Sequence, residues 1–143
     1  MFQLSYFIFI LEENMIQHND FHLGNILVEQ KTCQLKIIDL ETVVDYKNKK
    51  VFSHMVKYSS NGEKYRMGWN NKFHPGSDLN QIFGDLLHNF ESNIPKFIYD
   101  KIKPRLIYHD KEFPYAIMTD NKLTTGKEML KLLKDITNKY FKK

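Results

Sequence analysis

The stretch IQHNDFHLGNILV, residues 16–28, sets a group of polar side chains between two apolar segments. Two histidines, an aspartate and two asparagines occur within it, and each of these side chains can form hydrogen bonds or bind a metal. The apolar ends predict that the chain leaves the core and re-enters it, so the polar residues form a loop between two regular elements. Such a loop is typical of catalytic and binding sites, although a polar connection without a chemical role has the same composition.

The segments on either side of this loop are predicted to be a helix and a β-hairpin. Residues 2–16 would be apolar on nearly every side of a helix, which predicts a buried helix. The loop itself covers residues 17–25. Two short apolar runs within residues 26–39, joined by a turn around QKTC, predict a hairpin whose second strand ends at Asp39.

The rest of the chain is predicted to be mostly helical. Residues 40–76 are predicted to be a long loop, because the stretch from Ser59 to Gly76 is polar, contains glycine and shows little periodicity. Apolar residues then recur at helical spacing, which predicts a long buried helix over residues 77–90 with Ser77 as its N-cap. Further helices are predicted within residues 94–141, and the last of them begins with a Thr–Glu capping box at Thr125.

Composition limits the class of protein. The 143 residues, 42% of them hydrophobic and 14% aromatic, predict one globular domain of the α+β class that is mostly helical. Cys33 is the only cysteine, which excludes an internal disulfide and fits a reducing, cytoplasmic compartment. The apolar run at the N-terminus has no basic residues ahead of it and is too short to cross a bilayer, so we expect no membrane partner.

The net charge of +4 comes almost wholly from scattered lysines, because the only arginines are Arg66 and Arg105. Proteins that read nucleic acid use the guanidinium fork of arginine, which binds guanine and phosphate through two hydrogen bonds. We therefore expect a solvated basic surface and no specific nucleic-acid partner. Binding of polyanions in general, through this basic surface, is the weakest of three functional hypotheses for this chain.

Three side chains whose oxygen atoms can bind a metal occur in the loop and at the end of the predicted hairpin. Asp20 and Asn25 lie in the loop, and Asp39 follows the second strand of the hairpin. Two carboxylates and one amide oxygen are hard donors that suit Mg²⁺, which usually takes one or two carboxylates together with substrate phosphates. The group therefore predicts a phosphate-bearing ligand. The alternation of His18, Asp20 and His22 allows a metal triad instead, but that interpretation gives Asn25 and Asp39 no part.

HNDFHLGN, residues 18–25, resembles the catalytic loop of the protein-kinase-like superfamily, whose pattern is H-x-D-x-x-x-x-N. IIDLE resembles the strand and metal-binding aspartate that follow, with Asp39 in the place of the D-F-G aspartate. SDLNQIFGDLL resembles the long buried helix whose early acid, here Asp78, supports the loop. The likeness covers roughly residues 2–92 and implies a kinase C-terminal lobe. His22 makes the loop similar to that of small-molecule kinases and of divergent kinase-like proteins of large DNA viruses.

The resemblance implies a role for each of these residues. Asp20 would orient the acceptor hydroxyl and take its proton, and His22 would lie near the transferring phosphoryl group, where a cation would help. Asn25 and Asp39 would hold Mg²⁺ on the phosphates of ATP. Structural support for the loop would come from His18 and Asp78. The implied activity is transfer of the γ-phosphate of ATP to a hydroxyl acceptor, a protein or a small molecule, with ATP and Mg²⁺ as cofactors.

Parts of the family's pattern have no counterpart in this sequence. A kinase has a glycine-rich loop, a strand lysine and a helix glutamate ahead of its catalytic loop, and only 17 residues precede His18. We therefore expect a truncated C-terminal lobe without its N-lobe, and a separately encoded N-lobe as a partner. Glu41 stands where D-F-G has glycine. The alternative function is a non-catalytic pseudokinase or scaffold remnant.

Overall fold

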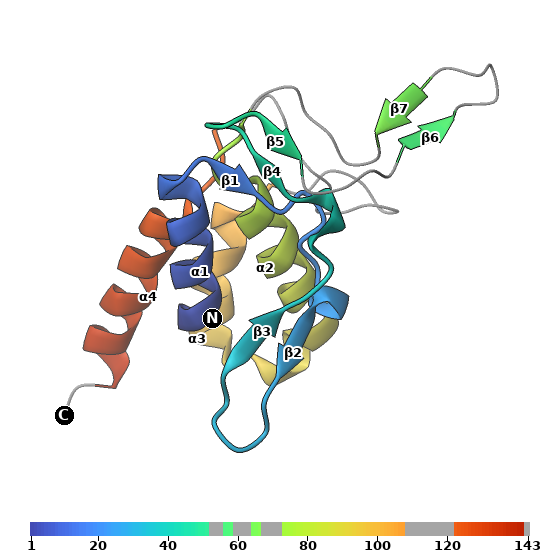
Figure 1. Ribbon diagram of the computed structural model, residues 1–143. Helices are drawn as coiled ribbons and strands as arrows, with labels where there is room; N and C mark the ends of the chain where they lie inside the picture. The colour runs from blue at the N-terminus through green and yellow to red at the C-terminus, as the bar shows by residue number, and fades with distance from the viewer. Residues whose placement is uncertain (52–55, 59–63, 67–72, 108–121, 142–143) are drawn as a thin grey trace.

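The computed structural model describes residues 1–51, 56–58, 64–66, 73–107 and 122–141. Within these ranges the fold is α+β and mostly helical, with four α-helices and small antiparallel sheets. This agrees with the fold class expected from the sequence. Figure 1 shows the helices side by side, with one hairpin at one end of the bundle and the three-stranded sheet at the other.

The bundle is built from α1 (Phe2–Glu13), α2 (Ser77–Phe90), α3 (Lys96–Ile102) and α4 (Gly126–Tyr140). Helix α1 packs mainly against α4 and also contacts α2. The start of α4 lies so close to α1 that a Cβ atom on Gly126 would come within 2.5 Å of the backbone nitrogen of Phe9. Glycine at this position therefore allows the two helices to touch through their backbones.

Helix α2 lies at the centre of the core. Its predicted bounds, residues 77–90, are confirmed, and its apolar stripe is buried. The predicted N-cap is wrong by one residue, because Ser77 is the first helical residue and Gly76 is the N-cap. Gly76 has a φ of 88° and no room for a Cβ atom beside Leu123, so the chain requires glycine here. The core side chains from all parts of the bundle include Leu4, Ile8, Phe21, Leu79, Ile82, Phe83, Leu87, Ile102, Met129 and Leu133.

The hairpin expected within residues 26–39 is present. Strands β2 (Ile26–Val28) and β3 (Leu35–Ile37) pair antiparallel, with Ile26 opposite Ile37. The turn between them includes the QKTC segment. At the end of β3 the chain passes directly into the 3₁₀ turn η2 (Leu40–Thr42), so the hairpin delivers Asp39 to a fixed place.

The segments on either side of the polar loop and the hairpin differ from the prediction. Helix α1 ends at Glu13 and not at residue 16, because Met15 has a φ of 55° and the chain turns into β1 (Ile16–Gln17). Residues 40–76 are not irregular throughout, since they supply the following strands. These are β4 (Val44–Asp45), β5 (Lys50–Val51), β6 (Val56–Tyr58) and β7 (Lys64–Arg66).

Strand β4 lies between β1 and β5 in one antiparallel sheet, and β6 pairs with β7. The remainder of the expected loop, residues 52–55, 59–63 and 67–72, lies outside the described residues.

The C-terminal predictions hold where the structure describes them. Helix α3 ends at Ile102, shortly before Pro104. The capping box of α4 is formed, because Thr125 accepts a hydrogen bond from the backbone of Glu128 and the Glu128 side chain accepts one from the backbone of Thr125. Residues 108–121, which belong to the range 94–141 predicted to contain the last helices, lie outside the described residues.

Helix α1 is more exposed than its sequence suggests. Leu4, Ser5 and Ile8 are its buried residues, whereas Phe2, Tyr6 and Ile10 are 47%, 58% and 41% exposed. The expectation of a helix buried on every side is therefore wrong for the described part of the chain, because α4 and α2 cover only one side of it. No helix within the described ranges is long and apolar enough to cross a membrane.

Candidate functional site

The polar loop runs from β1 through the 3₁₀ turn η1 (Leu23–Asn25) to β2, and it lies against α2. Asp78, in the first turn of α2, accepts hydrogen bonds from the backbone N–H groups of His18 at 2.6 Å and Asn19 at 3.0 Å. Its carboxyl group is buried, and burial raises its pKa to about 6 although the two N–H donors act in the opposite direction. The structure thus places Asp78 directly against the start of the loop.

Two further side chains of α2 bind the same loop, and the sequence analysis missed both. Gln81 accepts a hydrogen bond from the backbone N–H of Phe21 at 2.9 Å, and Asp85 accepts one from Leu23 at 2.8 Å. With Asp78 they occupy positions i, i+3 and i+7, which lie on one face of a helix. The available signal was the spacing of Asp78, Gln81 and Asp85, which places three acceptor side chains on one face of the helix.

His18 connects the loop to the end of the hairpin. Its ring is 1% exposed, stacks on Phe21 and places Nε2 3.3 Å from the backbone oxygen of Ile38. Burial lowers the pKa of His18, while the contact with Ile38 and the negative charges of Asp20 and Asp39 oppose that shift. The charges of both Asp20 and Asp39 therefore act on this one buried ring.

Asn25 links Asp20 to the residue that precedes Asp39. Its side-chain nitrogen donates a hydrogen bond to the backbone oxygen of Asp20 at 2.9 Å, and its own backbone oxygen accepts one from Ile38 at 2.9 Å. This use of the amide nitrogen leaves the amide oxygen as the atom of Asn25 that can bind a ligand. No hydrogen bond within the described residues engages that oxygen.

Asp39 is held in an unusual backbone conformation at an exposed position. Its φ of 56° and ψ of 69° lie in the left-handed region, which residues other than glycine adopt rarely and at some energetic cost. Thr42, three residues later, donates a hydrogen bond to the backbone oxygen of His18 at 2.7 Å and accepts one from the side chain of Asn19 at 3.0 Å. These bonds fix the chain after Asp39, so its carboxylate projects from a rigid support.

The side-chain oxygens of Asn25 and Asp39 are donors of the kind that Mg²⁺ prefers, but they are too few to hold a metal without other ligands. No three or more His, Cys, Asp or Glu side chains in the described part of the chain lie close enough to share a metal, which argues against the triad of His18, Asp20 and His22. Asn25 and Asp39 offer two oxygen ligands, and Mg²⁺ normally completes its shell with water and phosphate oxygens. The exposed Glu41 lies in η2, two residues beyond Asp39.

Asp20 and His22 face each other on the exposed side of the loop. Nε2 of His22 lies 3.7 Å from Oδ2 of Asp20, and the two side chains are 42% and 43% exposed. A carboxylate at this place can receive a proton from a bound hydroxyl group. This candidate base is connected through Asn25 to Ile38, the residue before the candidate metal ligand Asp39.

An apolar groove of about 480 Å³ lies between α1 and the hairpin. Leu40, which follows Asp39, is one of its lining residues, so the groove adjoins the candidate site. The other apolar side chains that line it include Tyr6, Phe7, Ile10, Leu35 and Ile37.

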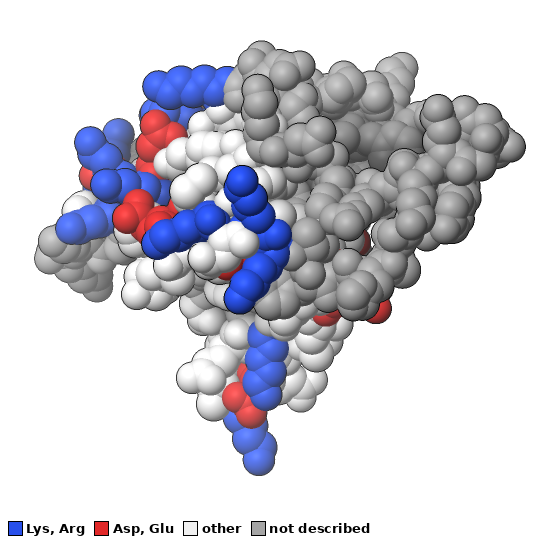
Figure 2. Space-filling view, turned by 45° about the horizontal axis from the view of Figure 1, so that its top comes forward, with Lys and Arg blue, Asp and Glu red and all other residues white. Residues whose placement is uncertain are grey.

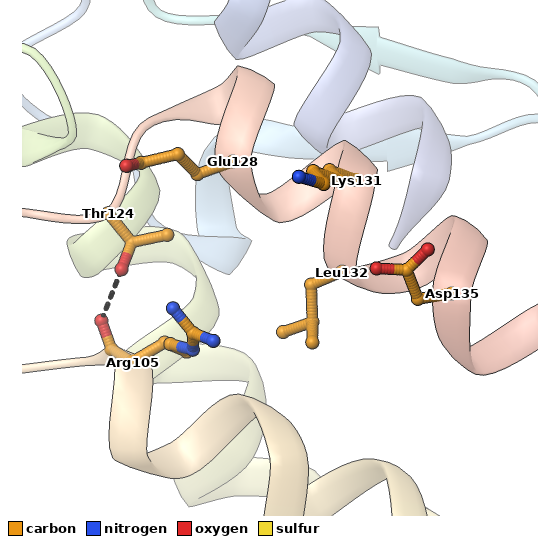
Figure 3. A pocket seen from close by; sticks show the side chains of 6 residues that line it. All are labelled: Arg105, Thr124, Glu128, Lys131, Leu132 and Asp135. Carbon is orange, nitrogen blue, oxygen red and sulfur yellow. Dashed lines mark hydrogen bonds between the residues drawn. The ribbon is translucent and has the colours of Figure 1, made fainter.

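A second hollow, of about 360 Å³, lies between the end of α3 and helix α4 (Figure 3). Arg105 and Lys131 line it together with Glu128 and Asp135, so its charges are balanced. Figure 2 shows lysine and arginine side chains in several separate groups on the face in view, with acidic side chains among them. Neither feature forms a continuous basic groove of the kind that binds nucleic acid.

Comparisons of the chain with protein-family models, with curated proteins and with solved structures find no match.

Proposed function

We propose that this chain is a kinase-like phosphotransferase domain, equivalent to a C-terminal lobe, that transfers the γ-phosphate of ATP to a hydroxyl acceptor. The observation that supports this best is the hydrogen-bonded connection through Asn25. Its side chain holds the backbone of Asp20, and its backbone holds Ile38, the residue before Asp39. One asparagine thus sets the spacing between a candidate base and a candidate metal ligand.

The proposed roles follow from what phosphoryl transfer requires, which is mainly positioning and the neutralisation of charge. Asp20 orients the acceptor hydroxyl and takes its proton as the oxygen bonds to the γ-phosphorus, while the bond to the β–γ bridging oxygen breaks and ADP leaves. Asn25 and Asp39 hold the metal–nucleotide complex. Mg²⁺, when bound, neutralises the negative charge of the phosphates. His18 and Asp78 keep the loop in place. None of these roles determines which acceptor binds.

A non-catalytic scaffold is the second candidate function, and one observation favours it. Four apolar residues, Tyr6 in α1, Leu27 and Val28 in the hairpin and Leu40 in η2, are between 51% and 58% exposed. Exposed apolar clusters are common where a protein binds a partner. A partner bound there, including a separately encoded N-lobe, would lie beside Asp39.

The test is transfer or hydrolysis of the γ-phosphate by the whole chain, compared with Asp20→Asn. We expect turnover to fall by roughly a hundredfold or more, because a positioned base contributes that much. Asp135→Asn, the same change on the exposed face of α4, serves as the control and should match the wild type. Equal turnover in all three proteins would reject the role of Asp20. Nucleotide binding without turnover in any of them would favour the scaffold.

A further inference from the structure

The orientation of the His22 ring is fixed by a backbone hydrogen bond. The backbone N–H of Gly24 donates to Nδ1 of His22 at 3.1 Å, so that His22 caps the short turn η1. A backbone N–H can only donate, so Nδ1 must be the acceptor and carries no proton. The ring proton of His22 is consequently on Nε2.

That proton faces the candidate base. Nε2 lies 3.7 Å from Oδ2 of Asp20 on the exposed side of the loop. The bond made by one imidazole nitrogen decides what the other nitrogen can do, as in metal sites where a second partner orients a histidine ligand. Here the bond to Gly24 leaves Nε2–H as the ring group that lies near the carboxylate of Asp20.

Gly24 is needed for this arrangement because of space. A Cβ atom at this position would lie 2.8 Å from Cε1 and 3.0 Å from Nδ1 of His22. Carbon atoms do not approach so closely, so any larger residue would push the ring away from its place. The lack of a side chain at Gly24 therefore keeps the His22 ring against the turn.

We propose that His22 and Gly24 form a positioning pair, in which Gly24 fixes the Nε2–H tautomer of His22 and His22 orients the carboxylate of Asp20. This inference rests on the proposed function only in taking Asp20 as the base; the tautomer of His22 does not depend on that function. In it the Nε2–H of His22 lies 3.7 Å from Oδ2 of Asp20, which is an electrostatic contact and not a hydrogen bond. His22 does not act as the cation beside the phosphoryl group that the resemblance implies.

The first experiment measures the tautomer without nucleotide or acceptor. Long-range ¹H–¹⁵N correlation spectra of the whole chain, at mildly alkaline pH, should show His22 as the Nε2–H tautomer. In Gly24→Ala the signals should shift toward a mixture of the two tautomers. His88, exposed in the last turn of α2, is the internal reference and should be unchanged. An Nδ1–H tautomer in the wild type, or an unaltered His22 in Gly24→Ala, would overturn the proposal.

The second experiment separates the two nitrogens by substitution. The amide nitrogen of His22→Gln can take the place of Nε2, whereas the amide oxygen of His22→Asn can take the place of Nδ1 only. We expect kcat to fall roughly tenfold or more in His22→Asn and less in His22→Gln, with the KM for ATP unchanged in both. His88→Asn is the matched control. A kcat equal to wild type in His22→Asn would contradict the positioning role.

The two experiments also separate failure of this proposal from failure of the proposed function. Absence of turnover in every protein, wild type included, would count against the phosphotransferase. The tautomer of His22 would still decide whether the positioning pair exists.

Discussion

The two sides of the polar loop differ in burial and in how their polar groups are satisfied. On the side that faces α2, four backbone N–H groups donate to the side chains of Asp78, Gln81 and Asp85. On the opposite side, Asp20 and His22 are 43% and 42% exposed, and their side chains contact each other. The first side uses long-range hydrogen bonds, and the second keeps its oxygen atoms available.

This difference indicates that stability and chemistry are separated within a single loop. Buried donors that lose their acceptor are costly, so the side facing α2 should govern folding. Exposed carboxylates contribute little to stability, so the open side can carry ligand-binding groups.

The largest effect is expected for Asp78→Ala. It leaves the N–H groups of His18 and Asn19 buried without an acceptor, so the free energy of unfolding should fall by about 2–5 kcal/mol. Asp78→Asn keeps one acceptor oxygen and should lose less. Denaturant-induced unfolding measures both, with Asp135→Ala on the surface of α4 as the control. A loss below about 0.5 kcal/mol in Asp78→Ala would remove the distinction between the two sides.

A change in stability is also expected with pH, because the two buried acids bind protons differently in the folded and the unfolded chain. Burial raises the pKa of Asp78 from 3.8 to about 6 and that of Glu12 from 4.5 to about 7. The folded chain therefore binds these protons more tightly than the unfolded chain.

The direction of the pH dependence follows from these raised pKa values. Stability from these two groups is greatest below about pH 4 and declines as the pH rises to about 7, then stays constant. Glu12 accepts bonds from the backbone N–H groups of Gly76 and Gly126, so Glu12→Gln tests its share. Urea midpoints between pH 4 and pH 8 should decline less steeply in Glu12→Gln. An identical slope would show that Glu12 does not titrate there.

Gln81→Ala and Asp85→Ala should each reduce stability by about 1–2 kcal/mol, since each leaves one partly buried N–H without its acceptor. Each loss of stability should exceed that of His88→Ala, a substitution on the exposed surface of α2. Unfolding by denaturant measures the loss, and hydrogen exchange of the Phe21 and Leu23 amides locates it. Amide exchange as slow as in the wild type would contradict the assignment of these acceptors.

The smallest change in stability is expected for Asp39→Gly. Glycine adopts a positive φ without strain, so stability should stay the same or rise by up to about 1 kcal/mol. The same substitution removes a proposed ligand, so binding of Mg²⁺–ATP should be lost. Thermal unfolding together with a binding titration checks both effects. A clear loss of stability would show that the Asp39 carboxylate supports the fold.

Local patterns in the sequence predicted those elements whose signals are local. The apolar stripe of residues 77–90 gave the bounds of α2, and Thr125 with Glu128 gave the start of α4. Strands β1 and β4 were missed because two residues are too few to show alternation, and they pair only through contacts distant in sequence. The exposure of α1 was missed because hydrophobicity does not reveal which neighbours are present.

Part of the candidate site was predicted from the sequence for the same reason. Asp20, Asn25 and Asp39 belong to one loop and the hairpin that follows it, so spacing alone suggested that they meet. Asp78 bonds to a residue 60 positions away and was expected only through a family resemblance. Gln81 and Asp85 are two of several polar residues in α2, and nothing in the sequence identified the backbone groups that they bind.

The most direct test of the central claim is calorimetric titration of the whole chain with ATP in the presence and absence of Mg²⁺. We predict saturable binding that requires Mg²⁺ and weakens at least about tenfold in Asp39→Asn, because a charged ligand to the metal is lost. Asp135→Asn should bind as the wild type does. Equal binding by wild type and Asp39→Asn, or no binding by the wild type, would contradict the assignment of Asn25 and Asp39 as the metal–nucleotide site.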